Sequence, residues 1–178
     1  PTIHAMVRDV TKLPRDDIQL NTVVKGDARS ATDIQNALQQ SGANWIIISV
    51  GNGENVAKSD IRTANALATV SVLQKPQFSH VRAVVVSSTG AGGSRIIVGM
   101  GIGKIIEFHL RHVLADHTGQ EEAFAVLRDR VTIPRATALT DDHPVGKLVA
   151  FGDKDKSPTI KTDRADLAAW IVNEICGE

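Results

Sequence analysis

Two uninterrupted apolar runs, each ending in small residues, constrain the fold of this chain more than any other feature. Residues 45–51 are WIIISVG, and residues 83–90 are AVVVSSTG. Runs of β-branched residues without polar alternation are typical of strands buried on both faces, as in a parallel sheet covered by helices. Ligands of such sheets bind at the carboxyl ends of the strands. We therefore expect Gly51, Ser87 and Ser88 to face a ligand.

Strand and helix patterns alternate through the first half of the chain. The predicted strands lie at residues 3–7, 22–24, 45–50 and 83–86, and the predicted helices lie near 30–41 and 59–74. Within the second helix, Leu67 is predicted to face inward. This alternation predicts an α/β fold, a Rossmann-like, doubly wound and mostly parallel sheet with right-handed crossovers. The length of 178 residues suits a single domain over residues 1–178.

The second half of the chain is less regular. We expect a glycine-rich loop at 90–103, one or two helices over 104–130 with the second starting at Asp116, and a strand at 131–133. Two short edge strands at 147–151 and 159–161 are also expected, followed by a final helix with Thr162 as its N-cap.

Composition and charge exclude several classes of protein. Twenty Lys plus Arg balance 20 Asp plus Glu and are dispersed, so no electrostatic footprint for nucleic acid or an anionic membrane is present. No apolar stretch reaches the ~18 residues of a membrane span. The single cysteine, Cys176, excludes an internal disulfide framework and fits a reducing compartment, so we expect a cytoplasmic protein.

Arginine and aspartate follow the first two predicted strands, where a dinucleotide fold binds adenosine. An arginine fork matches a ribose 2′-phosphate, so Arg8 favours NADP over NAD, and a surface pair of Arg8 with Asp9 is the alternative. Asp27 and the following Ala28 are candidates for binding adenine, although a Gly-Asp turn is common. Gly51, Asn52 and Gly53 follow a buried strand where the backbone must pass close to a cofactor, or else form a plain turn.

Few side chains offer catalytic chemistry. His117 is a candidate proton donor or a buried structural histidine, and the hydroxyls of Ser87 and Ser88 are further candidates. The chain has no tyrosine, which removes the Tyr-x-x-x-Lys acid of short-chain dehydrogenases. We expect no metal site, because the histidine spacing places no repeated pair on one helix face. The glycines at 99–104 lack the spacing of a phosphate loop and favour a mobile flap. No serine lies in the Gly-x-Ser-x-Gly motif of hydrolases.

These landmarks follow one another in the order typical of a known family. They are MVRD at 6–9, VKGD at 24–27, VSSTG at 86–90, LADH at 114–117, TIPR at 132–135 and DRADLA at 163–168. The set resembles the NAD(P)H-binding atypical short-chain dehydrogenase group, which includes flavin reductase/biliverdin-IXβ-reductase-like and NmrA-like proteins. The resemblance implies a Rossmann fold, with NADP bound through Arg8, Asp27, Gly51 and Ser87. It further implies a nicotinamide edge near His117, Pro134 and Arg135.

The chain departs from this family at two places. The family has Arg-Pro where this chain has Arg135-Ala136. It also begins with a strand and a Gly-x-x-Gly-x-x-Gly turn, whereas this sequence starts where the family's second strand begins. Because that first strand is central in the 3-2-1-4-5-6 order, its loss leaves unpaired backbone between two strands. Either the chain is a trimmed or natural fragment, or the strands close up or a partner molecule supplies one, and the exposed edges suggest a homodimer.

Two functional hypotheses follow from these observations. The first is an NADP-dependent oxidoreductase that transfers hydride from NADPH to a flavin or a similar conjugated small-molecule acceptor, bound among the loops at 90–103 and 136–158. The alternative is a non-catalytic, NmrA-like redox-sensing or protein-interaction module that has lost cofactor chemistry. A chain without the glycine-rich turn is expected, under this alternative, to bind no cofactor.

Overall fold

The computed structural model describes residues 2–13, 19–53 and 55–177. The helices are α1 (Ala31–Ser41), α2 (Ile61–Leu73), α3 (Ile102–His109), α4 (Arg111–Phe124) and α5 (Arg164–Cys176), with short 3-10 turns η1 (Val10–Lys12), η2 (Pro76–Phe78), η3 (Gly99–Gly101) and η4 (Ala125–Arg130). The strands are β1 (His4–Val7), β2 (Thr22–Lys25), β3 (Trp45–Ile48), β4 (Arg82–Val85), β5 (Ser87–Ser88), β6 (Val131–Thr132), β7 (Arg135–Ala136), β8 (Ala138–Thr140) and β9 (Lys161–Asp163). Ser30 caps α1 through a bond from the Asp33 amide, and Gly42 ends it, as expected.

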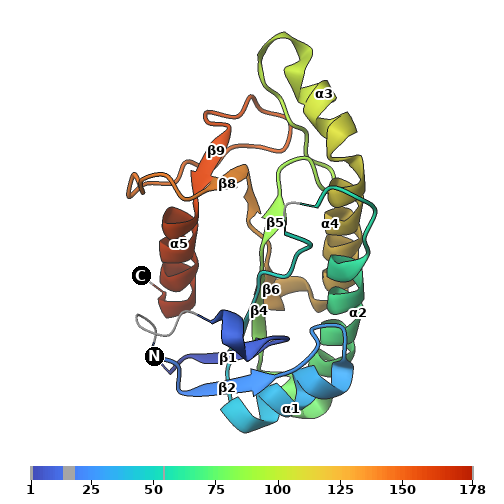
Figure 1. Cartoon of the computed structure of the whole chain (residues 1–178), viewed down its shortest axis with the longest axis vertical. Coiled ribbons are helices and arrows are strands. Elements are labelled where there is room, and N and C mark those ends of the chain that lie inside the picture. The colour runs from blue at the N-terminus through green and yellow to red at the C-terminus, as the bar shows by residue number, and fades with distance from the viewer. Residues whose placement is uncertain (1, 14–18, 54, 178) are drawn as a thin grey trace.

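All strand pairs are parallel, and helices cover both faces of the sheet. The paired groups are β1–β2, β3–β4–β6, β5–β7 and β8–β9. Neighbouring residues of β4 point to opposite faces: Val85 packs in one core with Ile34 and Phe124, whereas Val84 packs with Leu167 and the rest of α5. Figure 1 shows α5 on one side of the strands and α2 with α4 on the other. The doubly wound, mostly parallel α/β fold is confirmed.

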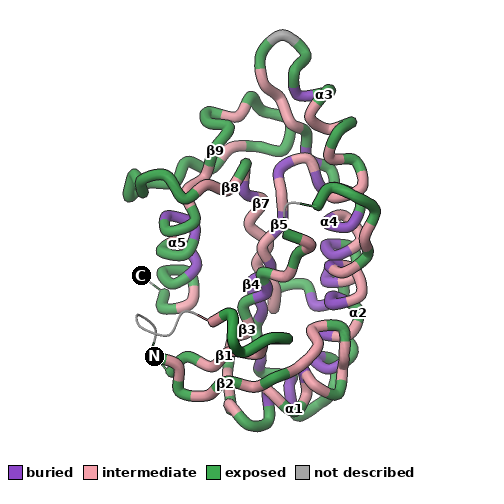
Figure 2. The backbone as a smooth tube through the Cα atoms, in the orientation of Figure 1, coloured by how far each residue is buried: buried purple, intermediate pink, exposed green. Residues whose placement is uncertain are grey.

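The sheet is split between β1 and β3, where the family's central first strand would lie. Among the described residues, β1 pairs only with β2, and β3 pairs only with β4, so no strand joins the two groups. Figure 2 shows the β1–β2 pair beneath β3. The edges of β1 and β3 that face away from their partners have therefore not closed up against each other.

Several local predictions in the chain were wrong. The helix break lies at Leu110, and Asp116 is inside α4, where it bonds to another helix. Residues 147–151 form no strand; they line a cavity, and β9 pairs with β8 instead. The N-cap of α5 is Asp163, whose carboxylate accepts from the Ala165 amide. Leu67 is 59% exposed, because the opposite face of α2 packs on the core.

In the ranges that the structure describes, none of the helices has the length and hydrophobicity to span a bilayer.

Candidate active site

Charged groups gather at the carboxyl ends of β1 and β2. Both carboxylate oxygens of Asp27 accept bonds from the Arg29 side chain, at 3.1 Å from Nε and 2.8 Å from Nη2, and Oδ1 also accepts from the Arg29 amide. The Arg29 side-chain bonds are the largest cause that lowers the pKa of Asp27 to about 2, and the charge of Arg8 adds to this lowering. One guanidinium therefore pairs with the Asp27 carboxylate at this exposed edge, and Arg8 follows the neighbouring strand.

Contacts with α2 tie this edge to the loop that follows β3. The Asn65 side chain donates to the Ala28 carbonyl at 2.7 Å, which holds the loop after β2 in place. The charge of Asp60, just before α2, contributes to the raised pKa of Arg29. The loops after β2 and β3 therefore lie side by side at the ligand edge of the sheet.

The glycines after β3 make room for a side chain of α2. A Cβ atom on Gly51 would lie 2.8 Å from Arg62 Nη2, so the guanidinium takes the space that a side chain would need. The Asn52 carbonyl accepts from the Asn55 amide, and Gly53 has a φ of +62°. The predicted loop is thus a glycine-dependent turn, with the buried cation of Arg62 directly beneath it.

A buried carboxylate from α4 occupies the amino terminus of α2. Asp116 accepts from the amides of Arg62 at 3.1 Å and Thr63 at 2.9 Å, from Thr63 Oγ1 at 2.9 Å and from Arg62 Nη1 at 3.4 Å. Asp60, at the N-cap position itself, makes no capping bond. The positive end of α2 is therefore already neutralised by the protein.

A second polar network joins β5, α4 and β7. Ser87 Oγ donates to Glu121 Oε1 at 2.6 Å, and Arg135 donates to both Glu121 oxygens, from Nε at 2.9 Å and from Nη2 at 2.7 Å. Arg135 Nη1 also donates to Asp153 at 2.8 Å, and these bonds raise the pKa of Arg135. Ser88 instead donates to the Thr89 carbonyl. Of the predicted catalytic hydroxyls, only that of Ser87 belongs to this network.

Pro134 and Arg135, which were predicted to lie at a nicotinamide edge, contact β5 and line a cavity. The Pro134 carbonyl accepts from the Ser87 amide at 2.9 Å and so continues the pairing between β5 and β7. Both residues line a cavity of about 650 Å³. Arg135 and Asp153 of the network therefore contribute to the wall of that cavity, and Glu121 holds Arg135 from behind it.

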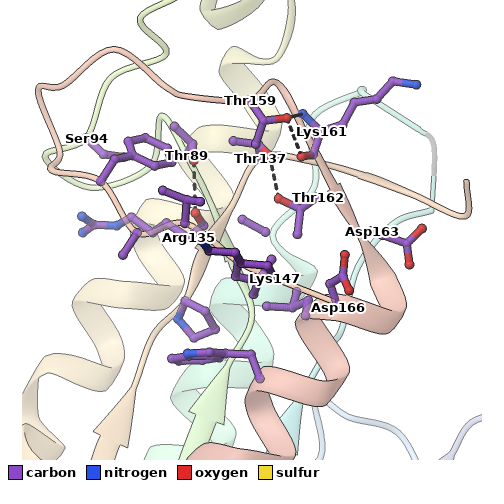
Figure 3. A pocket seen from close by; sticks show the side chains of 18 of the residues that line it. Thr89, Ser94, Arg135, Thr137, Lys147, Thr159, Lys161, Thr162, Asp163 and Asp166 are labelled. Carbon is purple, nitrogen blue, oxygen red and sulfur yellow. Dashed lines mark hydrogen bonds between the residues drawn. The ribbon is translucent and has the colours of Figure 1, made fainter. Parts of the chain in front are cut away.

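The cavity lies above the carboxyl ends of the strands, and its surface is mainly apolar although polar and charged side chains also line it. Segment 136–158 supplies much of the wall, whereas segment 90–103 supplies only Ser94. Figure 3 shows the labelled Arg135, Lys147 and Asp166 side chains around the space. Asp166 accepts from the amides of Val145 and Gly146 and so holds the covering loop against α5. This size and lining suit a small, mainly apolar ligand.

His117 is buried beside Arg62. Its Nδ1 lies 3.3 Å from Gln120 Oε1. Burial, reinforced by the charge of Arg62, lowers the pKa of His117 to about 4. The imidazole is therefore neutral at pH 7, which favours the structural hypothesis for this residue over the proton-donor hypothesis.

We expect the stability of the protein to fall between pH 6.5 and pH 4 because of His117. In this window the unfolded chain binds a proton at His117 and the folded protein does not, which destabilises the fold by up to about 3 kcal/mol. Urea unfolding at pH 7, 5 and 4 measures this loss. His117→Gln should flatten the profile, whereas His109→Gln, at an exposed position, should not. Equal profiles for both variants would contradict the assignment.

One glycine of segment 99–104 has a packing role. A Cβ atom on Gly103 would lie 1.8 Å from the Ile96 carbonyl oxygen, so this glycine allows α3 to contact the backbone before it.

In the described ranges, no three His, Cys, Asp or Glu side chains cluster in a way that suits a metal ion.

Sequence analysis missed Arg29, Arg62 and Asp153. Arg29 bonds to Asp27, two residues before it in the chain. The spacing Asp-x-Arg after a strand is therefore a local signal for Arg29. Arg62 and Asp153 meet their partners 54 and 18 residues away, and no local pattern indicates such contacts.

A parallel, doubly wound sheet with polar loops at its carboxyl edge defines the class of Rossmann-like nucleotide-binding proteins. Residues 2–176 match the family model described as NAD(P)H-binding, and the chain belongs to this family. The predicted resemblance to atypical short-chain dehydrogenases is confirmed. No curated protein sequence matches the chain significantly.

Solved structures share the fold at low sequence identity. A protein described as an NAD-dependent epimerase/dehydratase from Bacillus halodurans is 20% identical, with a TM-score of 0.71 over 97% of this chain and 75% of that chain. The anaerobillin reductase ChuY from Escherichia coli O157:H7 is 19% identical, with a TM-score of 0.67 over 98% of this chain and 78% of that one. A short-chain dehydrogenase/reductase from Veillonella parvula, in complex with NADP, is 17% identical, with a TM-score of 0.65 over 98% and 75%.

The site residues fit the two ends of a nicotinamide dinucleotide better than its middle. Arg8 and Arg29 offer cations after β1 and β2, where adenosine was predicted to bind, and Ser87 and Arg135 offer polar groups where the nicotinamide was predicted. Between them, the amino terminus of α2 is filled by Asp116 and that of α1 is capped by Ser30. Within the described residues, neither of these two helix termini is left open for a pyrophosphate.

Proposed function

We propose that this protein is an NADP-preferring oxidoreductase that reduces a small conjugated acceptor such as a flavin. One observation carries the preference for NADP: Arg29 pairs with Asp27 just after β2, and Arg8 directly follows Val7, whose register partner is Lys25 at the end of β2. A 2′-phosphate carries the charge and oxygens that guanidinium groups bind in bidentate geometry. Membership of the NAD(P)H-binding family supports a nicotinamide cofactor in general.

At the adenosine end, Arg29 is the residue best placed to exchange partners. It is held by Asp27, and both side chains are about half exposed, so the ion pair is weak and an incoming phosphate can share the guanidinium. Ala28 and Asn65 keep the backbone of this loop in position. We expect Arg8 to approach the same phosphate from the end of β1.

At the other end, the network around Glu121 holds the groups that face the acceptor. When bound, the cofactor supplies a hydride from its nicotinamide ring. Glu121 fixes the Arg135 guanidinium at the cavity wall and also accepts from the buried Ser87 hydroxyl. Arg135 presents a permanent positive charge that stabilises negative charge developing on a reduced acceptor. Pro134 lies at the same wall.

The cavity beyond Arg135 supports the choice of acceptor. Its wall is mainly apolar, with aromatic surface from Phe151 and Trp170 and a cation from Lys147. A planar conjugated molecule buries its ring faces against such a surface, and an acidic substituent pairs with the lysine. The proposed acceptor class is therefore planar, conjugated and anionic.

We expect Arg8→Ala and Arg29→Ala each to weaken NADPH binding by about 10-fold to 100-fold, or roughly 1.5–3 kcal/mol, because each removes a charged bond to the 2′-phosphate. NADH binding should change less than about twofold, because NADH lacks that phosphate. Calorimetric titration with both nucleotides measures the two affinities.

The exposed Arg95, which pairs with Glu107, offers a matched control, and Arg95→Ala should leave both affinities unchanged. Equal losses for NADPH and NADH would overturn the 2′-phosphate assignment. A folded protein that binds neither nucleotide would overturn the proposed function and favour the non-catalytic alternative.

A further inference from the structure

We propose that the Arg135 guanidinium binds a carboxylate of the acceptor, and that Asp153 holds this place on Arg135 until such an acceptor enters the cavity. The acceptor class is therefore a conjugated ring system that bears a carboxylate. This inference rests on the proposed function, because it names the acceptor of the same site.

Arg135 contacts two carboxylates that differ in burial. Glu121 accepts from Nε at 2.9 Å and from Nη2 at 2.7 Å, and its side chain is 9% exposed. Asp153 accepts from Nη1 at 2.8 Å, and its side chain is 57% exposed. A buried carboxylate needs its partner, whereas an exposed one is solvated by water when it leaves. Glu121 is therefore the fixed partner of Arg135, and Asp153 is the exchangeable one.

The exchangeable bond lies on the cavity side of the guanidinium. Arg135 and Asp153 line the cavity, whereas Glu121 does not. On the side of Glu121 the main chain comes close, since a Cβ atom on Gly92 would lie 2.6 Å from Arg135 Nη2 and 2.5 Å from Glu121 Oε2. A ligand in the cavity therefore reaches Arg135 at Nη1, where Asp153 is bound.

The backbone at Asp153 is held independently of its side chain. The Asp153 carbonyl accepts from the Arg95 amide at 2.9 Å. The turn around it is closed by the Asp155 amide, which donates to the Gly152 carbonyl, and by the Asp155 carboxylate, which accepts from the Gly152 amide. The Asp153 side chain therefore leaves Arg135 by a change of rotamer, while the loop over the cavity stays in place.

Charge favours a carboxylate as the group that replaces Asp153. Exchange of one carboxylate for another keeps both charged bonds of Arg135 and leaves the charge around it unchanged. A neutral group at Nη1 would cost one charged bond. An anion added without exchange would meet a guanidinium that already pairs with two carboxylates.

The cavity wall defines the rest of the acceptor. Phe151 and Trp170 supply aromatic surface for a ring system. In a conjugated carboxylate, the negative charge that reduction adds is delocalised toward the carboxylate, so Arg135 stabilises it at the position where it binds the ligand. Lys147, which also lines the cavity (Figure 3), remains for a further acidic substituent.

Titration with 2-naphthoate and 2-naphthamide tests this assignment without a nucleotide. The two compounds have the same rings, and only 2-naphthoate is charged at neutral pH. Because Trp170 lines the cavity, its indole N–H signal in NMR spectra reports binding, and Trp45→Phe identifies the signal by removing the other indole. We expect 2-naphthoate to bind at least about fivefold more tightly than 2-naphthamide.

Variants of Asp153 test the exchange itself. Asp153→Asn should raise the affinity for 2-naphthoate by at least about threefold, because no carboxylate of the loop then competes for Nη1. The affinity for 2-naphthamide should change less than about twofold. Asp153→Glu keeps the competing charge and should bind 2-naphthoate as the unchanged protein does. A residue whose role is only structural would not produce a gain confined to the charged ligand.

Asp141→Asn is the matched control for loss of one negative charge. Asp141 is 79% exposed, pairs with Arg164 and does not line the cavity, so its replacement should leave both affinities unchanged. An equal gain with Asp141→Asn would mean that general charge, rather than exchange at Arg135, controls binding.

Three further results would overturn the proposal. They are the absence of binding by both compounds, equal or tighter binding of 2-naphthamide, and an unchanged affinity of the Asp153→Asn variant for 2-naphthoate. A protein that shows the expected preferences but binds no NADPH would refute the proposed function and leave the carboxylate site standing. Binding of NADPH without these preferences would refute the carboxylate site alone.

Discussion

Asp116→Ala will lower the free energy of unfolding by about 3 kcal/mol, because it removes one partner of a buried ion pair together with the cap of α2. The carboxylate is fully buried, and Arg62 is nearly so. Without Asp116, the Arg62 guanidinium stays under Gly51 with no neutralising charge. Urea unfolding at pH 7 measures the loss.

Asp60→Ala is the matched control for this prediction. Asp60 stands at the N-cap position of α2 but makes no capping bond, so its replacement should change stability by less than about 0.5 kcal/mol. Equal effects of the two changes would mean that the sequence-local residue, rather than Asp116, caps the helix. Asp116→Asn should recover part of the loss, because the amide oxygen still accepts one backbone bond.

The contrast between Asp60 and Asp116 also explains how far the sequence predicts this molecule. Uninterrupted β-branched runs predicted β3 and β4, and Ser30 with Gly42 predicted both ends of α1, since each signal lies within a few residues of the element it specifies. The cap of α2 comes from a residue 54 positions away, which only the folded chain brings near. Local patterns carry no such information.

The same distinction applies to the candidate site. Arg8, Asp27 and Ser87 were predicted because parallel sheets bind ligands at the carboxyl ends of strands; the structure places Arg8 and Asp27 after β1 and β2, and Ser87 at the start of β5, just beyond β4. What each side chain contacts depends on tertiary packing: Asp27 pairs with Arg29, and Ser87 with Glu121. The prediction for Leu67 failed for a similar reason, since apolar spacing alone does not say which face of a helix meets the sheet.

The split sheet relates the fold to the site. The expected gap between β1 and β3 is present, and it opens toward Ala28 and Asn65 at the ligand edge. The amino termini of α1 and α2 lie near this edge, and they are capped by Ser30 and by Asp116, respectively. The middle of a bound dinucleotide would therefore meet neither of these two helix termini as an open anion site.

Glu121→Gln should destabilise the protein by about 2–3 kcal/mol and disorder the wall of the acceptor cavity. Three bonds converge on this carboxylate, from Ser87 Oγ, Arg135 Nε and Arg135 Nη2. A carboxamide has one oxygen to accept with, and its NH₂ group faces the Arg135 donors, so at least one charged bond is lost and another becomes repulsive. Urea unfolding gives the stability change.

A neighbouring glutamate on the same helix separates this effect from a general loss of charge. Glu122 is exposed, so Glu122→Gln should change stability by less than about 0.5 kcal/mol. If Glu121 also positions Arg135 for the acceptor, the Glu121→Gln enzyme should lose turnover while its affinity for NADPH at the adenosine end changes little, because the Arg29 contacts are untouched. A positioning role predicts that turnover falls while NADPH affinity is kept. If turnover and NADPH affinity fall together, Glu121 only supports the fold.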